Sequence, residues 1–284
     1  MSGREPGLGA TAAMTFDVEE WFQVWAMRPH VARGDWDAHP SRVEASVDRL
    51  LEALDEHDAQ ATFFTLGWIA ERHAAMLRRI VGAGHELASH GYDHQLVHEQ
   101  CARQFEEDVR LAKTRLEQAA GVAVTGYRAA NFSIDRRTPW AHEVLGAQGY
   151  RYSSSSHPVR NDHYGDDRAE RLPHRAGPIV EIPVTTLRLF DRNWPCAGGG
   201  YFRLLPRVWT RHALQRVANA GERLVFYLHP WEIDPQQPRP SGLRWRTAVR
   251  HYTGLGSCLE NLRALLAERR WGRVDTVFAD VIEP

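Results

Sequence analysis

Short apolar runs alternate along the chain with longer segments in which apolar residues recur at helical spacing. The apolar runs predict strands at 13–18, 61–66, 85–89, 126–133, 150–152, 179–183 and 224–228. Helical periodicity, often ended by a glycine, predicts helices at 43–54, 70–81, 100–120, 140–148, 209–220 and 261–270. This alternation indicates an α/β domain with a mostly parallel sheet. A complete eight-unit barrel would be tight in 284 residues, so a distorted (β/α) barrel of about seven strands fits better.

Local signals suggest where the domain begins and how its parts divide. Ser41 is expected to cap the helix at 43–54, because a serine hydroxyl accepts hydrogen bonds from free backbone N–H groups. The polar, glycine-rich residues 1–11 are expected to be disordered, and residues 12–284 to form a single domain. A proline-rich stretch then sets off residues 236–284, which are too few for a confident second domain and are expected to be a C-terminal extension.

Composition and charge exclude several classes of protein. Hydrophobic residues make up 43% of the chain and charged residues 25%, which excludes a mostly disordered protein. The net charge is −1, so no overall basic field is expected to attract nucleic acid or an anionic membrane. No apolar run approaches the roughly 20 residues of a membrane helix, and none of signal-peptide length stands near the N-terminus. No feature of the sequence specifies an oligomeric state.

The number and spacing of the cysteines indicate the cellular compartment of the protein. Cys101, Cys196 and Cys258 are odd in number and far apart, which argues against a disulfide framework and favours a reducing environment. Together with the absence of a signal segment, this usage predicts a cytoplasmic protein.

Unusual polar residues follow four of the predicted strands. The first strand runs into Asp17 and Glu19, the third into His90, the fourth into Arg128 and the last into His229. Because the carboxyl ends of parallel strands meet at the same end of a sheet, these side chains are expected to share one site. Their agreement in position is stronger evidence than any one of the motifs.

The residue types favour a metal site. His90 and His94 are four residues apart, which lets both imidazoles converge on one ion from a helical face or across the start of a helix. Asp17 and Glu19 are two apart, so in an extended backbone both face the same side. Two histidines and one carboxylate are typical catalytic zinc ligands, and the second carboxylate is then free to act as a general base. Taken alone, the histidine pair would fit two surface histidines equally well, and the acidic pair would fit a solvated turn better than a site.

Two further residues have plausible catalytic roles. His229 directly follows an apolar strand, and Pro230 ends regular pairing there, so this imidazole could serve as a general acid or as a structural histidine. Arg128 could orient a carboxylate or form a surface salt bridge.

Four motifs in this order resemble the polysaccharide deacetylase family, the NodB-homology or carbohydrate esterase family 4 group. They are TFDVEEW at 15–21, SHGYDH at 89–94, GYRAANFSID at 126–135 and FYLHPWEIDP at 226–235. The resemblance is strongest to a bacterial branch associated with exopolysaccharide loci and exosortase systems, through ATFFTLGWIAER at 61–72, GGGYFRLLP at 198–206 and HYTGL at 251–255. It covers residues 12 to 284.

The resemblance implies a distorted barrel and a divalent metal, with zinc expected and cobalt, nickel or manganese as alternatives. Asp17 matches the family's catalytic base. Val18 stands where the family has its acidic metal ligand, so the resemblance assigns that role to Glu19, with Glu20 as the fallback, beside His90 and His94.

Other positions follow from the same resemblance. Arg128 matches the arginine that contacts the base, and His229 matches the general acid. The aspartate and tryptophan that tune this histidine in the family have no clear counterpart, and Asp191 and Trp194 are weak candidates.

Three residues are expected to bind substrate. The backbone N–H of Asn131 is expected to hold the oxyanion. Trp231 is expected to line the acyl pocket, and Tyr201 follows three glycines that would let the backbone approach a ligand or form a hinge.

The implied reaction removes N-acetyl groups from an amino-sugar polysaccharide, or from a lipid-linked or nucleotide-linked precursor, in exopolysaccharide biosynthesis. Two alternatives stay open: a cytosolic hydrolase of small ureide or imide amides, and an inactive relative that only binds glycan. The intact set of catalytic residue types argues against the second.

Overall fold

The computed structural model describes residues 11–159 and 165–283. Their main feature is a parallel sheet whose seven strands follow the order β10 (Leu224–Leu228), β1 (Ala12–Val18), β2 (Ala61–Thr65), β3 (Glu86–Ser89), β4 (Gly126–Tyr127), β5 (Tyr152–Ser153) and β7 (Ile179–Glu181). β6 (His174–Ala176) adds an antiparallel edge to β7, and β11 (Trp271–Gly272) pairs with the start of β1. The expected disorder of residues 1–11 falls, except for residue 11, outside the described residues.

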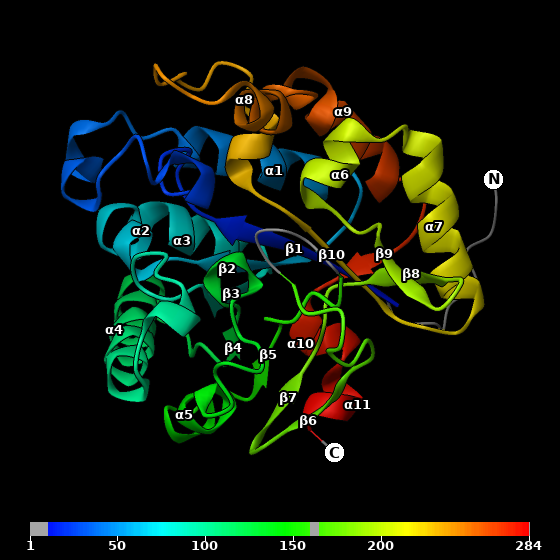
Figure 1. The fold of residues 1–284 in the computed structure, drawn as a ribbon, viewed down its shortest axis with the longest axis horizontal. Helices are drawn as coiled ribbons and strands as arrows, with labels where there is room; N and C mark the ends of the chain where they lie inside the picture. The colour runs from blue at the N-terminus through cyan, green and yellow to red at the C-terminus, as the bar shows by residue number, and fades with distance from the viewer. Residues whose placement is uncertain (1–10, 160–164, 284) are drawn as a thin grey trace.

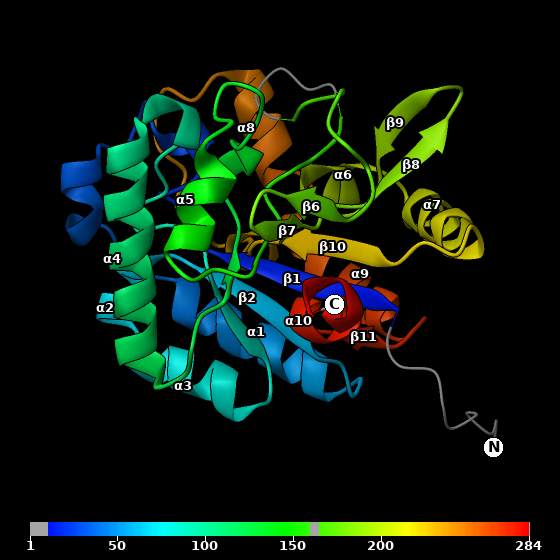
Figure 2. The same ribbon diagram turned by 90° about the horizontal axis from the view of Figure 1, so that it is seen from below.

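The sheet curls until its two ends approach one another (Figure 2). Just after β7, the Thr185 N–H donates to the carbonyl of Val225 in β10 at 3.2 Å, and the Val225 N–H donates to Thr185 Oγ1 at 2.7 Å. These bonds link the first and last parallel strands of the described sheet. The predicted α/β class and the distorted barrel of about seven strands are therefore confirmed.

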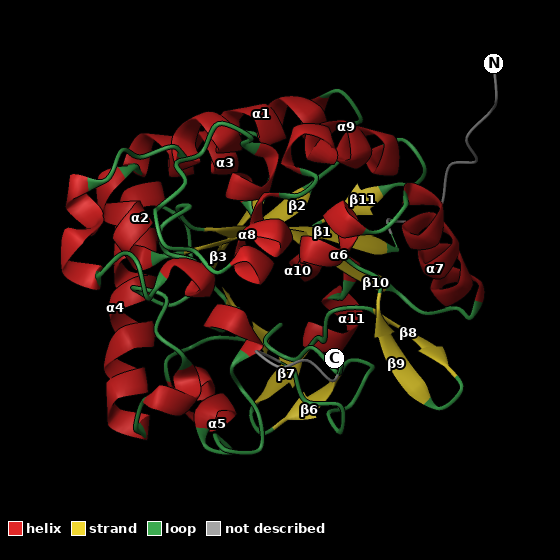
Figure 3. Cartoon of the chain, turned by 45° about the horizontal axis from the view of Figure 1, so that its top comes forward, coloured by secondary structure: helices red, strands yellow, loops and turns green. Residues whose placement is uncertain are grey.

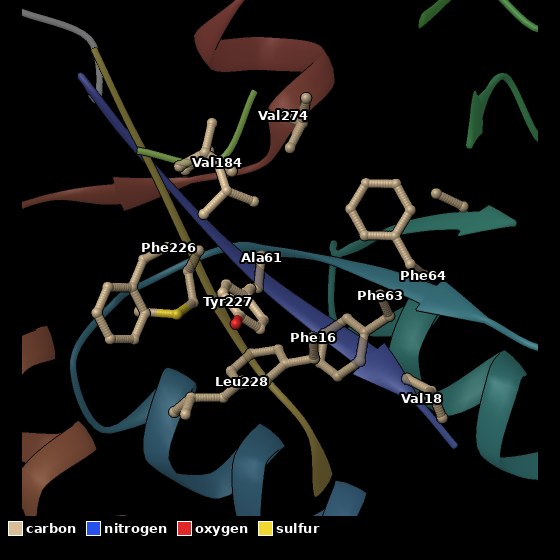
Figure 4. Close-up of a cluster of buried hydrophobic side chains, with 14 of the residues drawn as sticks. Phe16, Val18, Ala61, Phe63, Phe64, Val184, Phe226, Tyr227, Leu228 and Val274 are labelled. Atoms are coloured by element: carbon tan, nitrogen blue, oxygen red, sulfur yellow. The ribbon is translucent and has the colours of Figure 1, made fainter. Parts of the chain in front are cut away.

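The centre of the sheet is apolar on both faces. β1, β2 and β10 are buried along their whole length, because helices cover the outside while side chains fill the inside. Figure 4 shows this cluster, in which the rings of Phe16 and Phe63 lie 5.1 Å apart beside Phe64 and Phe226. Strands buried on both faces read as continuous apolar runs, which is why the sequence located them well.

Helices surround the strands over most of the circumference (Figure 3). They include α1 (Val43–Asp55), α3 (Ala74–Gly82), α4 (Ala102–Ala120), α5 (Ala141–Ala147), α7 (Arg207–Asn219) and α9 (Leu255–Leu266). The predicted helix at 70–81 is divided at His73 into α2 (Gly67–Arg72) and α3. The last predicted helix begins six residues earlier than expected, at Leu255. None of the helices in the described chain is long and apolar enough to span a membrane.

Several short elements were not predicted. The hairpin β8 (Thr186–Leu189) and β9 (Arg192–Pro195) and the helix α6 (Gly199–Leu204) follow β7. α8 (Trp245–Tyr252), α10 (Val274–Val277) and α11 (Ala279–Ile282) belong to the last fifty residues. α10 packs on β1, and the Val274 N–H donates to Thr62 Oγ1 in β2 at 2.8 Å. The C-terminal residues thus pack directly against the barrel, while the domain boundaries stay a prediction.

Gly198 fixes the position of α6 against β10. Its backbone has φ of 121°, and it bridges Tyr227 in parallel. A Cβ at this position would lie 1.8 Å from the carbonyl oxygen of Tyr227. The close approach therefore requires glycine, both for its φ and for the space.

We expect Gly198→Ala to lower the free energy of unfolding by about 2–4 kcal/mol, because the backbone must move away from β10. Gly256→Ala in α9 is the matched control, since a Cβ there meets nothing within 4 Å, and it should stabilise by about 0.5–1 kcal/mol. Urea unfolding of both variants measures the difference. Equal stability of the two variants would contradict this account of Gly198.

Candidate active site

The polar strand ends meet around one cavity. Asp17 closes β1, and Glu19 follows it by two residues, while His90 and His229 come directly after β3 and β10. All four line a cavity of about 410 Å³. Arg128 follows β4 and lies behind them, fully buried. The parallel topology brings the predicted residues together as the sequence suggested.

Glu19, His90 and His94 form the one cluster in the described residues suited to hold a metal ion. One ligand atom of each lies within 4.8 Å of the others. The two histidines share neither a helix nor a helix start: His94 stands in an irregular loop with φ of 61°. The first amides of α2 hold this loop, since the Gly67 N–H donates to the carbonyl of Gly91 at 2.9 Å. The four-residue spacing therefore brings the two imidazoles together through a loop. The expectation that they lie on a helix or across a helix start is corrected.

The orientation of these groups fits a divalent ion. His90 Nδ1 lies 2.9 Å from the Arg128 carbonyl, which can only accept, so Nδ1 carries the proton and Nε2 offers its lone pair to the cavity. His90 Nε2 and Glu19 Oε2 are buried without a hydrogen-bond partner. His94 Nε2 lies 2.8 Å from that same Glu19 oxygen. Three ligand atoms that crowd together in this way, two of them without a hydrogen-bond partner, are what a shared cation would explain.

The charges of the ligands agree with this interpretation. Burial alone would raise the pKa of Glu19, but the adjacent His94, together with His229 and His90, outweighs burial and the pKa falls to about 2. Burial lowers the pKa of His90 to about 4. An ionised carboxylate and a neutral imidazole are the forms that bind metal.

Glu20, the fallback ligand, turns away from the cavity. Its carboxylate accepts the backbone N–H groups of Arg42 and Val43 at 3.0 and 3.2 Å, and the hydroxyl of Ser41 donates to it as well. Ser41 is therefore not the N-cap of α1, which is Arg42; a glutamate from the preceding segment does the capping instead. Burial raises the pKa of Glu20.

Arg128 holds Asp17 in place. Its Nη1 donates to Asp17 Oδ1 and to Thr15 Oγ1, both at 2.7 Å, and its other nitrogens donate to the carbonyl and hydroxyl of Ser154. The guanidinium lies 4.1 Å from the centre of the Phe64 ring. The surface salt bridge considered for Arg128 is excluded by this burial, and Asp17 keeps its second oxygen for the cavity.

A run of serines after β5 supports the Arg128 loop, and sequence reasoning missed it. Ser155 Oγ accepts the N–H of Ala129 at 2.9 Å. Glu181 Oε1 in turn accepts the N–H groups of Ser155 and Ser156 at 2.7 and 2.8 Å. In the sequence, the four successive serines at 153–156 are the signal that could have revealed this support.

His229 is oriented by Glu232, a residue that sequence reasoning did not assign. Nδ1 lies 2.7 Å from Glu232 Oε1, and Glu232 Oε2 accepts from Arg203 Nε at 2.5 Å in a fully buried pair. Burial would lower the pKa of His229, but the bond to Glu232 and the charges of Glu19 and Asp17 raise it to about 9. Nε2 lies 3.6 Å from Glu19 and 3.9 Å from Asp17.

The weak candidates for this tuning role were wrong. Asp191 is fully exposed and faces Arg188 at 3.6 Å, and Trp194 is 45% exposed. Both belong to the β8–β9 hairpin and its turn, and neither lines the cavity. The signal for Glu232 in the sequence was its place three residues after His229, the spacing of a capping box, and its carboxylate accepts the backbone N–H of His229 at 3.2 Å.

Trp231 lines the cavity and also contacts Glu19, a candidate metal ligand. Its indole N–H donates to Glu19 Oε1 at 3.1 Å. Its ring stacks between His229, at 5.2 Å, and His251 of α8, at 4.4 Å. The expected substrate-contacting role stays a prediction, and the structure adds a positioning role for Glu19.

Asn131 and Tyr201 also line the cavity. Asn131 has φ of 51° and Phe132 has φ of 50°, so two successive non-glycine residues adopt the left-handed region, as strained loops at functional sites often do. Tyr201 lies in α6, just before Arg203. Whether these residues bind substrate stays a prediction, but both are placed to do so.

Comparisons with known proteins agree with the fold. Residues 11–152, half of the chain, match the family model "Polysaccharide deacetylase", and residues 154–279 match a domain of unknown function (DUF3473). A chitooligosaccharide deacetylase from Azorhizobium caulinodans is 31% identical over 204 residues, which cover 68% of this chain and 87% of the relative. A peptidoglycan deacetylase from Helicobacter pylori is 34% identical over 113 residues, 39% of this chain and 37% of the relative. The chain belongs to the polysaccharide deacetylase family.

Solved structures share the fold. A Mycobacterium smegmatis protein described as a polysaccharide deacetylase aligns with a TM-score of 0.63 at 23% identity, over 99% of this chain and 92% of that one. A mutant of a carbohydrate esterase family 4 pseudoenzyme with restored activity aligns with a TM-score of 0.51 at 14% identity. The alignment covers 94% of this chain and 66% of that one. Such likeness shows the fold alone. Since a pseudoenzyme shares it, activity must be argued from the residues of the site.

The ligand assignment can be tested by metal content. Glu19→Ala should lose most of the bound metal, because it removes a ligand atom. Glu20→Ala should keep the metal but lose about 1–3 kcal/mol of stability, since the N–H groups of Arg42 and Val43 at the start of α1 lose their acceptor. Elemental analysis and urea unfolding measure the two effects. Full metal content in a His90→Ala, His94→Ala double variant, or metal loss only in Glu20→Ala, would refute the assignment.

The role of Glu232 can be tested separately. Glu232→Gln should lower stability by about 3–5 kcal/mol, because the buried Arg203 loses its counter-charge. Turnover should fall more on an amide than on an aryl ester, since the aryl ester's leaving group needs less help from His229. Glu222→Gln, which breaks the pair with Arg171 away from the cavity, is the matched control. It should lower stability without changing the ratio of the two activities; the same ratio in both variants would argue against this role.

Proposed function

We propose that the protein is a metal-dependent hydrolase that removes N-acetyl groups from an amino-sugar polysaccharide or its lipid-linked or nucleotide-linked precursor. The observation that carries the proposal is one cavity lined by three kinds of group. They are the unbonded ligand atoms of Glu19 and His90 with His94, a carboxylate held by a buried arginine, and a histidine with a raised pKa. Binding alone would not require this combination.

The ligand chemistry favours zinc, with cobalt, nickel or manganese as alternatives, because two imidazoles and a carboxylate suit borderline-soft divalent ions. When bound there, such an ion would polarise the acetyl carbonyl and lower the pKa of water. The remaining chemistry belongs to the chain's own side chains.

Asp17 is placed to be the general base. Arg128 engages Oδ1, which leaves Oδ2 facing the cavity, 3.9 Å from His229 Nε2. As a water molecule attacks the acetyl carbon, Asp17 accepts its proton. The backbone N–H of Asn131 is the proposed donor to the developing oxyanion.

His229 is placed to be the general acid. Its Nδ1 proton is bonded to Glu232, so the Nε2 proton is the one that faces the substrate. When the carbon–nitrogen bond breaks, His229 gives this proton to the amine, and the water oxygen stays on carbon as acetate. A pKa near 9 keeps the imidazole protonated at neutral pH, as an acid must be.

The cavity joins the two halves of the chain into one functional unit. Glu19 and His90 come from the segment that matches the deacetylase model, while His229 and His251 come from the segment of unknown function. This supports residues 12–284 as one domain. A DUF3473 segment that completes the cavity would contribute to catalysis and to the choice of substrate.

The substrate class rests on the relatives. Those reported above are named as deacetylases of chitooligosaccharide and peptidoglycan, both N-acetylated glycans. A role in exopolysaccharide biosynthesis rests on the resemblance of the motifs at 61–72, 198–206 and 251–255. Release of acetate from N-acetylglucosamine oligomers and lipid-linked precursors, but not from cyclic ureides or imides, would separate this function from the small-amide alternative.

Variants of the proposed base and of the proposed acid should differ in how their turnover depends on the leaving group of the substrate. Asp17→Asn should keep the metal and lose roughly 10²- to 10⁴-fold in turnover on both an N-acetyl amide and an aryl acetate, because water must still be activated. His229→Ala should lose a similar factor on the amide and much less on the aryl acetate, whose leaving group needs little protonation. Steady-state kinetics on both substrates measure the ratio.

The control for these variants is His174→Ala, in β6 and outside the cavity lining, which should leave both activities unchanged. Equal defects of His229→Ala on both substrates would remove its assignment as the leaving-group acid.

A further inference from the structure

A short helix beside the cavity exposes an apolar strip next to a basic one. In α8, Trp245 is 70% exposed and Val249 is 51% exposed. They lie four residues apart and therefore on one side of the helix. Arg246 and Arg250, with the same spacing, form the neighbouring exposed strip. We call Arg244, Trp245, Arg246, Val249 and Arg250 the α8 face.

The arginines of the α8 face lack acidic partners. In the part of the chain that the structure describes, no ion pair involves Arg244, Arg246 or Arg250, whereas many other arginines are paired. The sequence reinforces this: residues 235–259 contain four arginines and no aspartate or glutamate, although the whole chain carries 36 acidic residues. The net charge of −1 therefore conceals a local basic segment.

The α8 face borders the mouth of the cavity. Arg250 and His251 of α8 line the cavity together with Tyr201 and Leu204 of α6, and the two helices pack side by side (Figures 1 and 3). Leu204 is 42% exposed and the adjacent Leu205 is 36% exposed. Apolar surface thus continues from α8 onto α6, around the entrance to the site.

We propose that the α8 face docks on the surface of a lipid bilayer that carries anionic lipids, with the cavity mouth towards the membrane. A helix with exposed tryptophan and valine beside unpaired arginines has the composition of an interfacial helix. Trp245 and Val249 favour lipid over a soluble polyanion, because a polyanion offers no apolar layer to accept them. Each arginine near an anionic leaflet adds about fivefold to the affinity.

This inference goes beyond the proposed reaction and does not depend on it. A protein docked in this way would meet a membrane-associated glycan at its cavity without crossing the bilayer. The docking can be measured on vesicles that contain no glycan, so its failure and the failure of the deacetylase proposal are distinguishable.

The experiment is co-sedimentation of the full-length protein with vesicles. One set is pure phosphatidylcholine and the other contains about 30 mol% phosphatidylglycerol, enough to give a negative surface potential. The protein should bind the anionic vesicles and not the neutral ones. Raising the salt concentration should weaken binding, because the charge attraction is screened.

Two double variants separate the apolar and the basic contributions of the α8 face to vesicle binding. Trp245→Ala with Val249→Ser should weaken binding at least tenfold, as buried apolar area is lost. Arg244→Gln with Arg246→Gln should weaken it about 25-fold, from two charges at about fivefold each; Arg250 is left in place because it lines the cavity. Both variants should keep the parent's melting temperature and its turnover of a soluble substrate.

The matched control is Val208→Ser with Arg216→Gln on α7. Val208 is 75% exposed and Arg216 is also exposed, so the control removes the same kinds of group from a different helix. It should bind vesicles like the parent. Equal losses in the control and the α8 variants would show that binding is non-specific and would overturn the proposal.

Three other outcomes would also overturn it. The first is no binding to anionic vesicles. The second is a concentration-dependent dimer that the Trp245→Ala, Val249→Ser variant abolishes, which would assign the face to a second copy of the chain. The third is binding to a soluble polyanion such as heparin that matches the binding to vesicles and is unaffected by that apolar variant.

Discussion

The buried guanidinium of Arg128 is the interaction on which the site depends. It lies where β1, β4 and β5 end, and it is satisfied on every side by Asp17, Thr15 and Ser154. Its own backbone carbonyl fixes the proton on His90 Nδ1. One residue thus orients both the proposed base and a proposed metal ligand. Leaving such a group without its partner in the interior costs about 3–5 kcal/mol, so the barrel end and the site are stable only together.

A second buried ion pair repeats this arrangement on the opposite wall. Arg203 neutralises Glu232, which orients His229, and also donates to the carbonyls of Arg250, His251 and Thr253. The same side chain therefore sets the position of the proposed acid and of α8. The two arginines come from different family segments, so each segment contributes one buried ion pair to the cavity, and the three cysteines are free.

The sequence predicted the parts of the site that depend on periodicity and failed on those that depend on distant pairing. Strands buried on both faces appear as apolar runs, so the residues at their ends could be named, and the two-residue alternation correctly aimed Glu19 rather than Glu20 at the cavity. Glu232 was missed because its charge is meaningful only beside Arg203, 29 residues away. Ser41 looked like a cap because its type fits, but a glutamate from another segment satisfies those amides. The β8–β9 hairpin has strands too short to give a clear period.

The distribution of charge explains how a nearly neutral chain can have both a cavity rich in ion pairs and a basic segment beside it. In the cavity, the carboxylates of Asp17, Glu19 and Glu232 face two arginines and four histidines, so the electrostatic field there is set by close pairs and not by the net charge of the chain. Outside the cavity, many acidic residues form ion pairs at the surface, and residues 235–259 contain no acidic residue. Because Arg203 binds the backbone of this same segment, the unpaired arginines of α8 are held at a fixed place beside the cavity. A group that α8 binds would therefore be held in a constant relation to His229.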